Sequence, residues 1–174
     1  MSDTLITVIA IALAAVLMFV FPLMTISDRN DDVAQLTVET ATTEFVDKIR
    51  STGKITKGNY DKFVETISST GNTYNVEMQV DVKDTNLGKK VSQAANDKIG
   101  ENVSYSIYTS QIEEALESGT GTYYCKEGDI VSASVKNTNQ TISQQLKNFF
   151  YSVTGNDSYT IAAQHAGVVT ANGK

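Results

Sequence analysis

The feature that most constrains this chain is an uninterrupted apolar run near its amino terminus. Residues 5–24 have the sequence LITVIAIALAAVLMFVFPLM, in which Thr7 and Pro22 are the only residues outside the hydrophobic class. Asp3 is the only charged residue before Asp28. A helix of this length, rising about 1.5 Å per residue, spans roughly 30 Å, the thickness of the hydrocarbon core of a bilayer. The run therefore predicts a membrane-spanning helix.

A cleaved secretory signal and a buried core helix are the two alternatives. A signal peptide has a basic amino-terminal region, a shorter apolar stretch and a cleavage site made of small residues. Here residues 1–4 contain no Lys or Arg, and residues 19–24 (FVFPLM) offer no such cleavage site. A core helix that is apolar on every side suits a much larger protein. We therefore expect a retained helix in a single-pass protein of the cell membrane.

The rest of the chain is polar and acidic, and its length fits one domain. The 174 residues carry a net charge of −6, and because Asp3 contributes one negative charge, residues 25–174 carry −5. Binding to nucleic acid needs a basic stripe, so we expect no nucleic-acid partner. Only Arg29 lies close enough to the apolar run to count under the positive-inside rule. The acidic body favours an extracytoplasmic position for residues after the membrane helix.

The chain continues after the apolar run as an amphipathic helix. Residues 25–52 contain neither Gly nor Pro. Apolar residues recur there at spacings of three or four, with others beside them: Val38, Ala41, Phe45 and Ile49, then Val33, Leu36 and Val46. One long helix over about 3–51, kinked at Pro22, is the first interpretation. The other is a membrane anchor followed by a separate stalk helix, capped by Ser27 or Asp28.

This architecture resembles that of the type IV pilin superfamily, including its archaeal and Tad-type relatives. The resemblance covers about the first 50 residues: an apolar helix of this length, Pro22, and an amphipathic continuation into an α+β head. Members of the family usually carry Glu at the fifth mature position, where it pairs with the terminal amine of a neighbouring subunit. Leu5 stands at the fifth position here, and Asp3 is the carboxylate available for that role. The resemblance implies a pilin-like structural subunit of a surface filament or an envelope-spanning machine.

The head predicted over 53–174 is a small antiparallel sheet covered by helices, which makes the whole chain α+β after a long kinked helix over 1–52. The clearest strand signal is 74–82, where apolar and polar residues alternate. Other strands are predicted at 103–107 and 159–170, and a hairpin at 122–136 that turns at 127–129. Helices are predicted from a Thr56 cap to about Gly71, over 110–118 with a Ser110–Glu113 capping box, and over 142–153, where one face carries Ile142, Leu146, Phe149, Phe150 and Val153.

The chain lacks the residues that most catalytic and metal sites combine. His165 is the only histidine and Cys125 the only cysteine. A triad or a zinc site would need His165 together with converging partners, so we expect a structural histidine. Cys125 lies in an apolar, aromatic strand and is expected to be an inert buried thiol. We therefore expect no enzyme activity, no catalytic residues, no cofactor and no metal.

The candidate functional residues are those of an assembly surface, namely Asp3, Ala10, Ala14, Pro22 and Phe45. Small residues let two membrane helices approach closely, and Pro22 lets the rod bend. An unpaired carboxylate is costly in an apolar environment, so Asp3 is expected at the interface or beside an amine. The expected partners are other copies of the chain, membrane lipid before assembly, and other pilin-like or secretion subunits.

A solitary membrane anchor is the alternative function. The chain would then be a single-pass binding or accessory subunit of a secretion or conjugation apparatus. Its head would contact other proteins through exposed aromatic residues such as Tyr123 and Tyr124. The sequence leaves both functions open.

Overall fold

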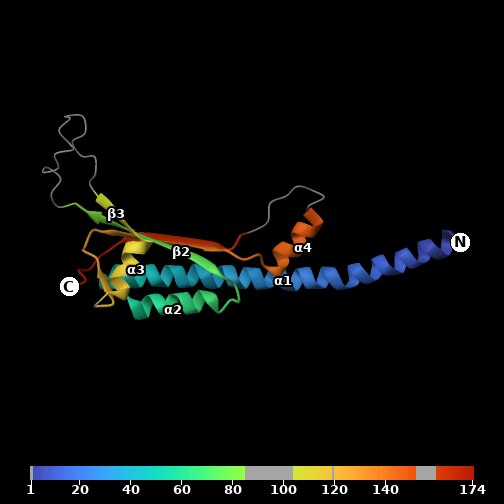
Figure 1. Ribbon diagram of the computed structural model, residues 1–174, viewed down its shortest axis with the longest axis horizontal. Coiled ribbons are helices and arrows are strands. Elements are labelled where there is room, and N and C mark those ends of the chain that lie inside the picture. Colours follow the sequence, from blue (N-terminus) through green and yellow to red (C-terminus); the bar gives the residue numbers. More distant parts are fainter. Residues whose placement is uncertain (1, 85–103, 119, 152–159) are drawn as a thin grey trace, which may run out of the picture.

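The computed structural model describes residues 2–84, 104–118, 120–151 and 160–174. One helix, α1 (Ser2–Thr52), accounts for 51 of these residues and extends far beyond the rest of the molecule (Figure 1). It is continuous, so the interpretation with a separate stalk helix is wrong. Gly53 ends α1 with a φ of +67°, and its N–H donates to the carbonyl oxygen of Ile49 at 2.7 Å. This is the left-handed ending that glycine allows.

The predicted kink is a bend within an unbroken helix. Pro22 lies inside α1, where it removes one backbone hydrogen bond. The amino-terminal part of α1 bends away from the line of the rest (Figure 1). The predicted α+β fold with a long kinked amino-terminal helix is confirmed.

A four-stranded antiparallel sheet forms the centre of the head. Its strand order is β3 (Ser104–Tyr108), β2 (Tyr74–Lys83), β5 (Ile130–Asn137) and β6 (Ala162–Val168). The alternation predicted for 74–82 is present in β2, where Met78, Val80 and Val82 are buried. Two short strands, β1 (Lys54–Thr56) and β4 (Thr122–Tyr124), pair antiparallel in a second sheet.

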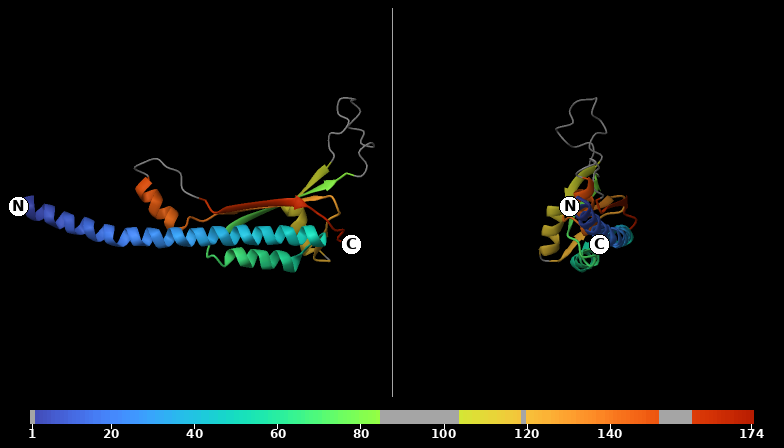
Figure 2. Two further views of the ribbon diagram at one scale, coloured as in Figure 1. Left: turned by 180° about the vertical axis from the view of Figure 1, so that it is seen from behind. Right: turned by 90° about the vertical axis from the view of Figure 1, so that its right-hand side faces the viewer.

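The described residues form three shorter helices: α2 (Lys57–Ser68), α3 (Thr109–Glu117) and α4 (Ile142–Tyr151), of which α4 packs on α1 away from the sheet (Figure 1). The second half of α1 and α2 lie on the same side of the four-stranded sheet (Figure 2). Val38, Val46 and Ile49 of α1 are at most 1% exposed and belong to the same core cluster as the sheet residues. The core of the head is therefore built partly from α1, although α1 ends where the predicted head begins.

Side chains of α1 cover the outer edge of β6. The Gln35 amide donates from Nε2 to the carbonyl oxygen of Ala162 at 2.7 Å and accepts from the Ala162 N–H at 3.0 Å. Arg50 donates from Nε to the carbonyl oxygen of Val168 at 3.0 Å. An open strand edge is a template for pairing with another chain. These contacts occupy the edge at both ends of β6.

Two sequence predictions about the head were wrong. The hairpin at 122–136 does not form, because β4 pairs with β1 while β5 pairs with β2 and β6. The capping box of Ser110 and Glu113 is also absent. Instead α3 begins at Thr109, the Tyr108 N–H donates to Oε1 of Gln111 at 3.1 Å, and the Glu113 carboxylate accepts from the Tyr60 hydroxyl at 2.8 Å.

The other predicted elements are present with shifted ends. The strand at 103–107 is β3, the strand at 159–170 is β6, and the helices at 110–118 and 142–153 are α3 and α4. The first residues of the predicted strands, 103 and 159, and the last two of the predicted helix, 152 and 153, lie outside the described residues.

Candidate assembly surface

The apolar segment, residues 5–24, makes up the first half of α1 and packs against little else in the chain. None of its most apolar 18-residue window is buried. Its large side chains are open to the surroundings, with Met18 75% and Phe19 74% exposed. By length and composition this helix is able to cross a membrane, a test that a signal sequence near the amino terminus also passes. The described residues of one copy therefore leave most of these side chains uncovered.

Three of the predicted assembly residues lie on the outside of this segment. Ala10 and Ala14 are exposed and occupy the same side of α1, one turn apart. Pro22 is also exposed. The arrangement places two small residues where a second helix can approach closely.

Asp3 lies in the first turn of α1 and is exposed. A carboxylate there interacts favourably with the positive end of the helix dipole. Its backbone carbonyl accepts a hydrogen bond from Oγ1 of Thr7 at 2.7 Å. The side chain is thus placed at the end of the rod.

Phe45 is not part of an assembly surface, and that prediction was wrong. It is only 5% exposed. Its ring stacks on Phe63 of α2 with centroids 4.5 Å apart, and it lies 6.3 Å from the ring of Tyr60 at a tilt of 48°. Because α2 covers this face of α1, Phe45 stabilises the head instead of contacting a neighbour.

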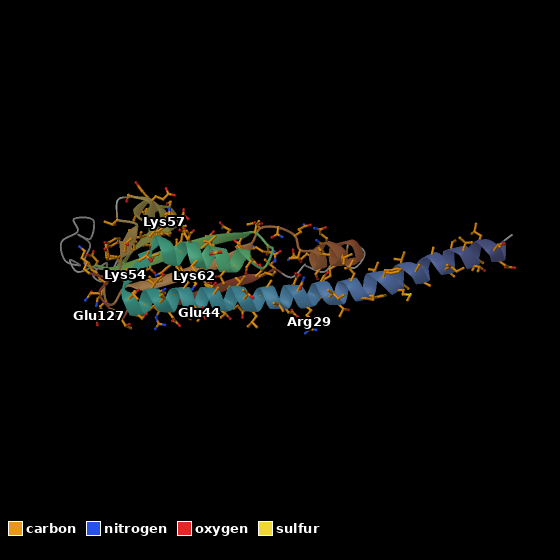
Figure 3. All side chains as sticks on the ribbon, turned by 90° about the horizontal axis from the view of Figure 1, so that it is seen from below. Arg29, Glu44, Lys54, Lys57, Lys62 and Glu127 are labelled. Carbon is orange, nitrogen blue, oxygen red and sulfur yellow. The ribbon has the colours of Figure 1, made fainter. Side chains whose placement is uncertain are left out.

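An exposed apolar stripe continues along α1 beyond the apolar segment. It consists of Ile26, Val33 and Leu36, which are 64%, 58% and 64% exposed. The sequence interpretation placed Val33 and Leu36 beside the buried face. At about 100° per residue, both lie roughly opposite the side of α1 that carries Val38 and Phe45. This spacing could have identified Val33 and Leu36 as exposed. Figure 3 shows Arg29, which lies between them in sequence, pointing away from the side on which α4 packs.

Two carboxylates of α1 hold α4 just after the apolar segment ends. Lys147 places its Nζ 2.6 Å from Oδ1 of Asp28, and the same carboxylate accepts a hydrogen bond from Ser143. Oγ1 of Thr141 donates to Oδ2 of Asp31 at 2.6 Å. The Lys147 and Ser143 contacts lower the pKa of Asp28 below its usual range. Burial raises the pKa of Asp31.

The single cysteine and the single histidine both lie in the head. Cys125 is 2% exposed, and burial, together with the nearby Asp129 charge, raises the pKa of its thiol to about 12. The prediction of a buried thiol is confirmed. His165 lies in the middle of β6, with Nε2 3.7 Å from Oδ1 of Asp47. Within the described residues, no group of three His, Cys, Asp or Glu side chains is placed to hold a metal ion.

The tyrosines of the alternative function differ in exposure. Tyr124 is 43% exposed, whereas Tyr123 is half-buried, and its burial raises the pKa of its hydroxyl to about 12. Both line a surface hollow of about 560 Å³ next to Cys125 and the carboxyl terminus. A small apolar contact with another protein is sterically possible there.

Comparison of the chain with models of protein families, with curated proteins and with solved structures gives no match. The resemblance to type IV pilins therefore remains an expectation based on the first 50 residues.

Proposed function

We propose that the chain is a pilin-like structural subunit that assembles through α1 into a surface filament or an envelope-spanning machine. Residues 5–24 hold the subunit in the membrane before assembly, with the head on the extracytoplasmic side. Copies of α1 then leave the lipid and bury their apolar sides against one another. The observation that carries this proposal is the exposed stripe of Ile26, Val33 and Leu36.

Two residues of the stripe, Val33 and Leu36, support assembly over a solitary anchor because lipid does not reach them. Val33 and Leu36 follow Met24 by nine and twelve residues, which places them about 14 and 18 Å beyond the apolar segment. The headgroup region adds only roughly 5–8 Å on each side of the hydrocarbon core. A lone anchor would leave both side chains in water, whereas burying one Leu or Val against a neighbouring helix stabilises by about 1.5–3 kcal/mol.

Other features of α1 are consistent with the same function. Ala10 and Ala14 would let a second helix approach where the rods are apolar on all sides. Asp3, at the end of the rod, would pair with the terminal amine of a neighbouring copy, as the resemblance implies. At the β6 edge of the sheet, the bonds from Gln35 and Arg50 disfavour the addition of a strand from another copy.

A solitary accessory subunit is the second candidate. The observation that favours it is the exposed Tyr124 beside the hollow near the carboxyl terminus. Contact with a different protein at that place would not require copies of α1 to meet.

Photo-crosslinking separates the two functions. A photoreactive amino acid at Leu36 of the membrane-resident chain is expected to give covalent dimers and higher species. The matched control places it at Lys62, an exposed position on α2 (Figure 3), where we expect far fewer self-adducts. Adducts of Leu36 with other proteins only would favour the accessory subunit. Monomers alone at both positions would contradict the filament proposal.

A further inference from the structure

Helix α4 is amphipathic, but its polar side faces inward and an apolar side chain faces outward. Ser143 and Gln144 are 2% and 6% exposed, while Ile142 is 61% exposed. Leu146 lies one turn after Ile142 on the same side and is half-buried. A helix that covers a core shows the opposite pattern. The described residues of this chain therefore leave Ile142 largely uncovered and cover Leu146 only in part.

Polar contacts fix α4 in this orientation. Thr141 precedes the helix, accepts from the Gln144 N–H at 3.2 Å, and bonds the Asp31 carboxylate. Ser143 and Lys147 are both bound to Asp28. Ser143 and Lys147 lie on the same side of α4. Because both are bound to α1, the side of α4 that carries Ile142 faces away from α1.

The position of α4 along α1 coincides with the end of the apolar segment. Asp28 follows Met24 by four residues, or about 6 Å of helix, which is the depth of the headgroup region. Among residues 3–26, only Val20 and Met24 are half-buried instead of exposed, and they lie on the side of α1 that continues to Asp31. Figures 1 and 2 show α4 leaving α1 at an angle, with its carboxyl end directed toward the amino-terminal end of α1.

We propose that α4 is a membrane-surface helix whose Ile142 side lies in the boundary between the lipid headgroups and the acyl chains. This inference rests on the membrane-spanning part of the proposed function. Interfacial amphipathic helices bury their apolar side about 5–10 Å into that boundary. The polar contacts to Asp28 and Asp31 couple α4 rigidly to α1. Two contacts with lipid then set the depth of α1 in the bilayer, one made by residues 5–24 and the other by α4.

A lipid surface suits this side of α4 better than a second copy of the chain does. The stripe that we assign to self-association lies across α1 from α4, as the direction of Arg29 shows (Figure 3). The two apolar surfaces are thus separated by the width of α1. The Ile142 side of α4 lies at the level where the bilayer ends, whereas Val33 and Leu36 of the stripe lie beyond it.

Tryptophan fluorescence tests the inference directly, because the chain contains no Trp. Single variants Ile142→Trp and Leu146→Trp of the full chain are reconstituted at low density in phosphatidylcholine vesicles. Lipids brominated at different depths serve as quenchers. Val16→Trp is the deep reference within the apolar segment, and Val168→Trp, on a 48% exposed side chain of β6, is the reference outside the membrane.

We expect the emission of Ile142→Trp and Leu146→Trp to shift to the blue and to lose intensity with shallowly brominated lipids. Val16→Trp should lose intensity with deeply brominated lipids, and Val168→Trp with none. If the two α4 variants resemble Val168→Trp while Val16→Trp is quenched, α4 does not lie at the membrane and the inference is overturned. If Val16→Trp is also unquenched, the membrane span itself fails. A blue shift that appears only at high protein density would assign this side of α4 to a second copy, which also overturns the inference.

Discussion

The two halves of α1 are one continuous helix in two different environments. Residues 27–52 have one side buried under the sheet and α2, with Val38 and Val46 completely covered. The described residues give residues 5–24 little cover, because all of them except the half-buried Val20 and Met24 are exposed. The difference teaches that apolar character alone does not place a residue in the core of its own chain. The second half finds its partner in the head, whereas under the proposed function lipid or other copies cover the first half.

Matched phenylalanine variants give the largest expected contrast between the halves. Phe45→Ala leaves a cavity under α2 and should lower the free energy of unfolding of the head by about 3–5 kcal/mol. Phe19→Ala makes the same change at a 74% exposed site and should alter head stability by less than about 0.5 kcal/mol. Urea unfolding in detergent, followed by near-ultraviolet circular dichroism, measures both. Similar losses in the free energy of unfolding for the two variants would contradict the different environments assigned to the two halves of α1.

A charge in the apolar segment should affect membrane residence without affecting the head. Leu13→Arg places a cation at the middle of the segment, at a cost of about 3 kcal/mol or a roughly hundredfold loss of membrane partitioning. Leu36→Arg is the matched control, because the same change lies beyond the bilayer. Flotation of membranes through a density gradient measures the bound fraction. Equal loss for the two variants would argue against residues 5–24 as the spanning segment.

Removing the cover of the β6 edge should have a smaller effect. Gln35→Ala leaves the N–H and the carbonyl of Ala162 without their partner, which should cost the head about 1 kcal/mol. Thr40→Ala, an exposed change on the same helix, should stay within about 0.5 kcal/mol. The same urea titration applies. A Gln35→Ala variant as stable as Thr40→Ala would show that water replaces the bonds without loss.

The smallest expected effects concern Asp28 and Asp31, two carboxylates that lie one turn apart where the two halves of α1 meet. Their effects on stability should depend on pH in opposite ways. Contacts with Lys147 and Ser143 lower the pKa of Asp28 in the folded chain. The stability that Asp28 contributes to the fold is therefore present above its pKa in the unfolded chain and is lost as pH falls through its pKa in the folded chain. Burial raises the pKa of Asp31 in the folded chain. The stability that Asp31 contributes to the fold is therefore present below its pKa in the unfolded chain and is lost as pH rises through its pKa in the folded chain.

Opposite changes in melting temperature follow from these opposite pKa shifts. At about pH 7, Asp28→Asn should melt below the unmodified chain and Asp31→Asn above it, and both differences should shrink toward about pH 3. Thermal unfolding in detergent at several pH values is the measurement. Shifts of the same sign at neutral pH would contradict the assigned environments.

The long helix and the alternation in β2 were predictable because both depend on local pattern. α1 contains no glycine before its end, and β2 alternates without interruption. The pairing of β4 was not predictable in this way. A turn at 127–129 is present, but the Asp129 carboxylate accepts from the N–H groups of Lys126 and Lys83, and the chain passes from one sheet to the other instead of folding back.

The exposure of Ala10, Ala14 and Pro22 was predictable from the apolar run alone, and their role in assembly stays a prediction. Phe45 was misplaced because the exposure of one helical side depends on α2, which local spacing does not reveal. The orientation of α4 depends on Asp28 and Asp31, which in the sequence are only polar residues flanking an apolar run.

The central claim is that exposed apolar surface on α1 joins copies of this chain. Electron microscopy of cells and of the material sheared from them tests it most directly, comparing the unmodified chain with Leu36→Asp. We predict fibres for the unmodified chain, and loss of those fibres for Leu36→Asp with the melting temperature of the head unchanged. An unmodified chain that forms no fibres and stays monomeric in detergent, or a Leu36→Asp chain that assembles normally, would contradict the account.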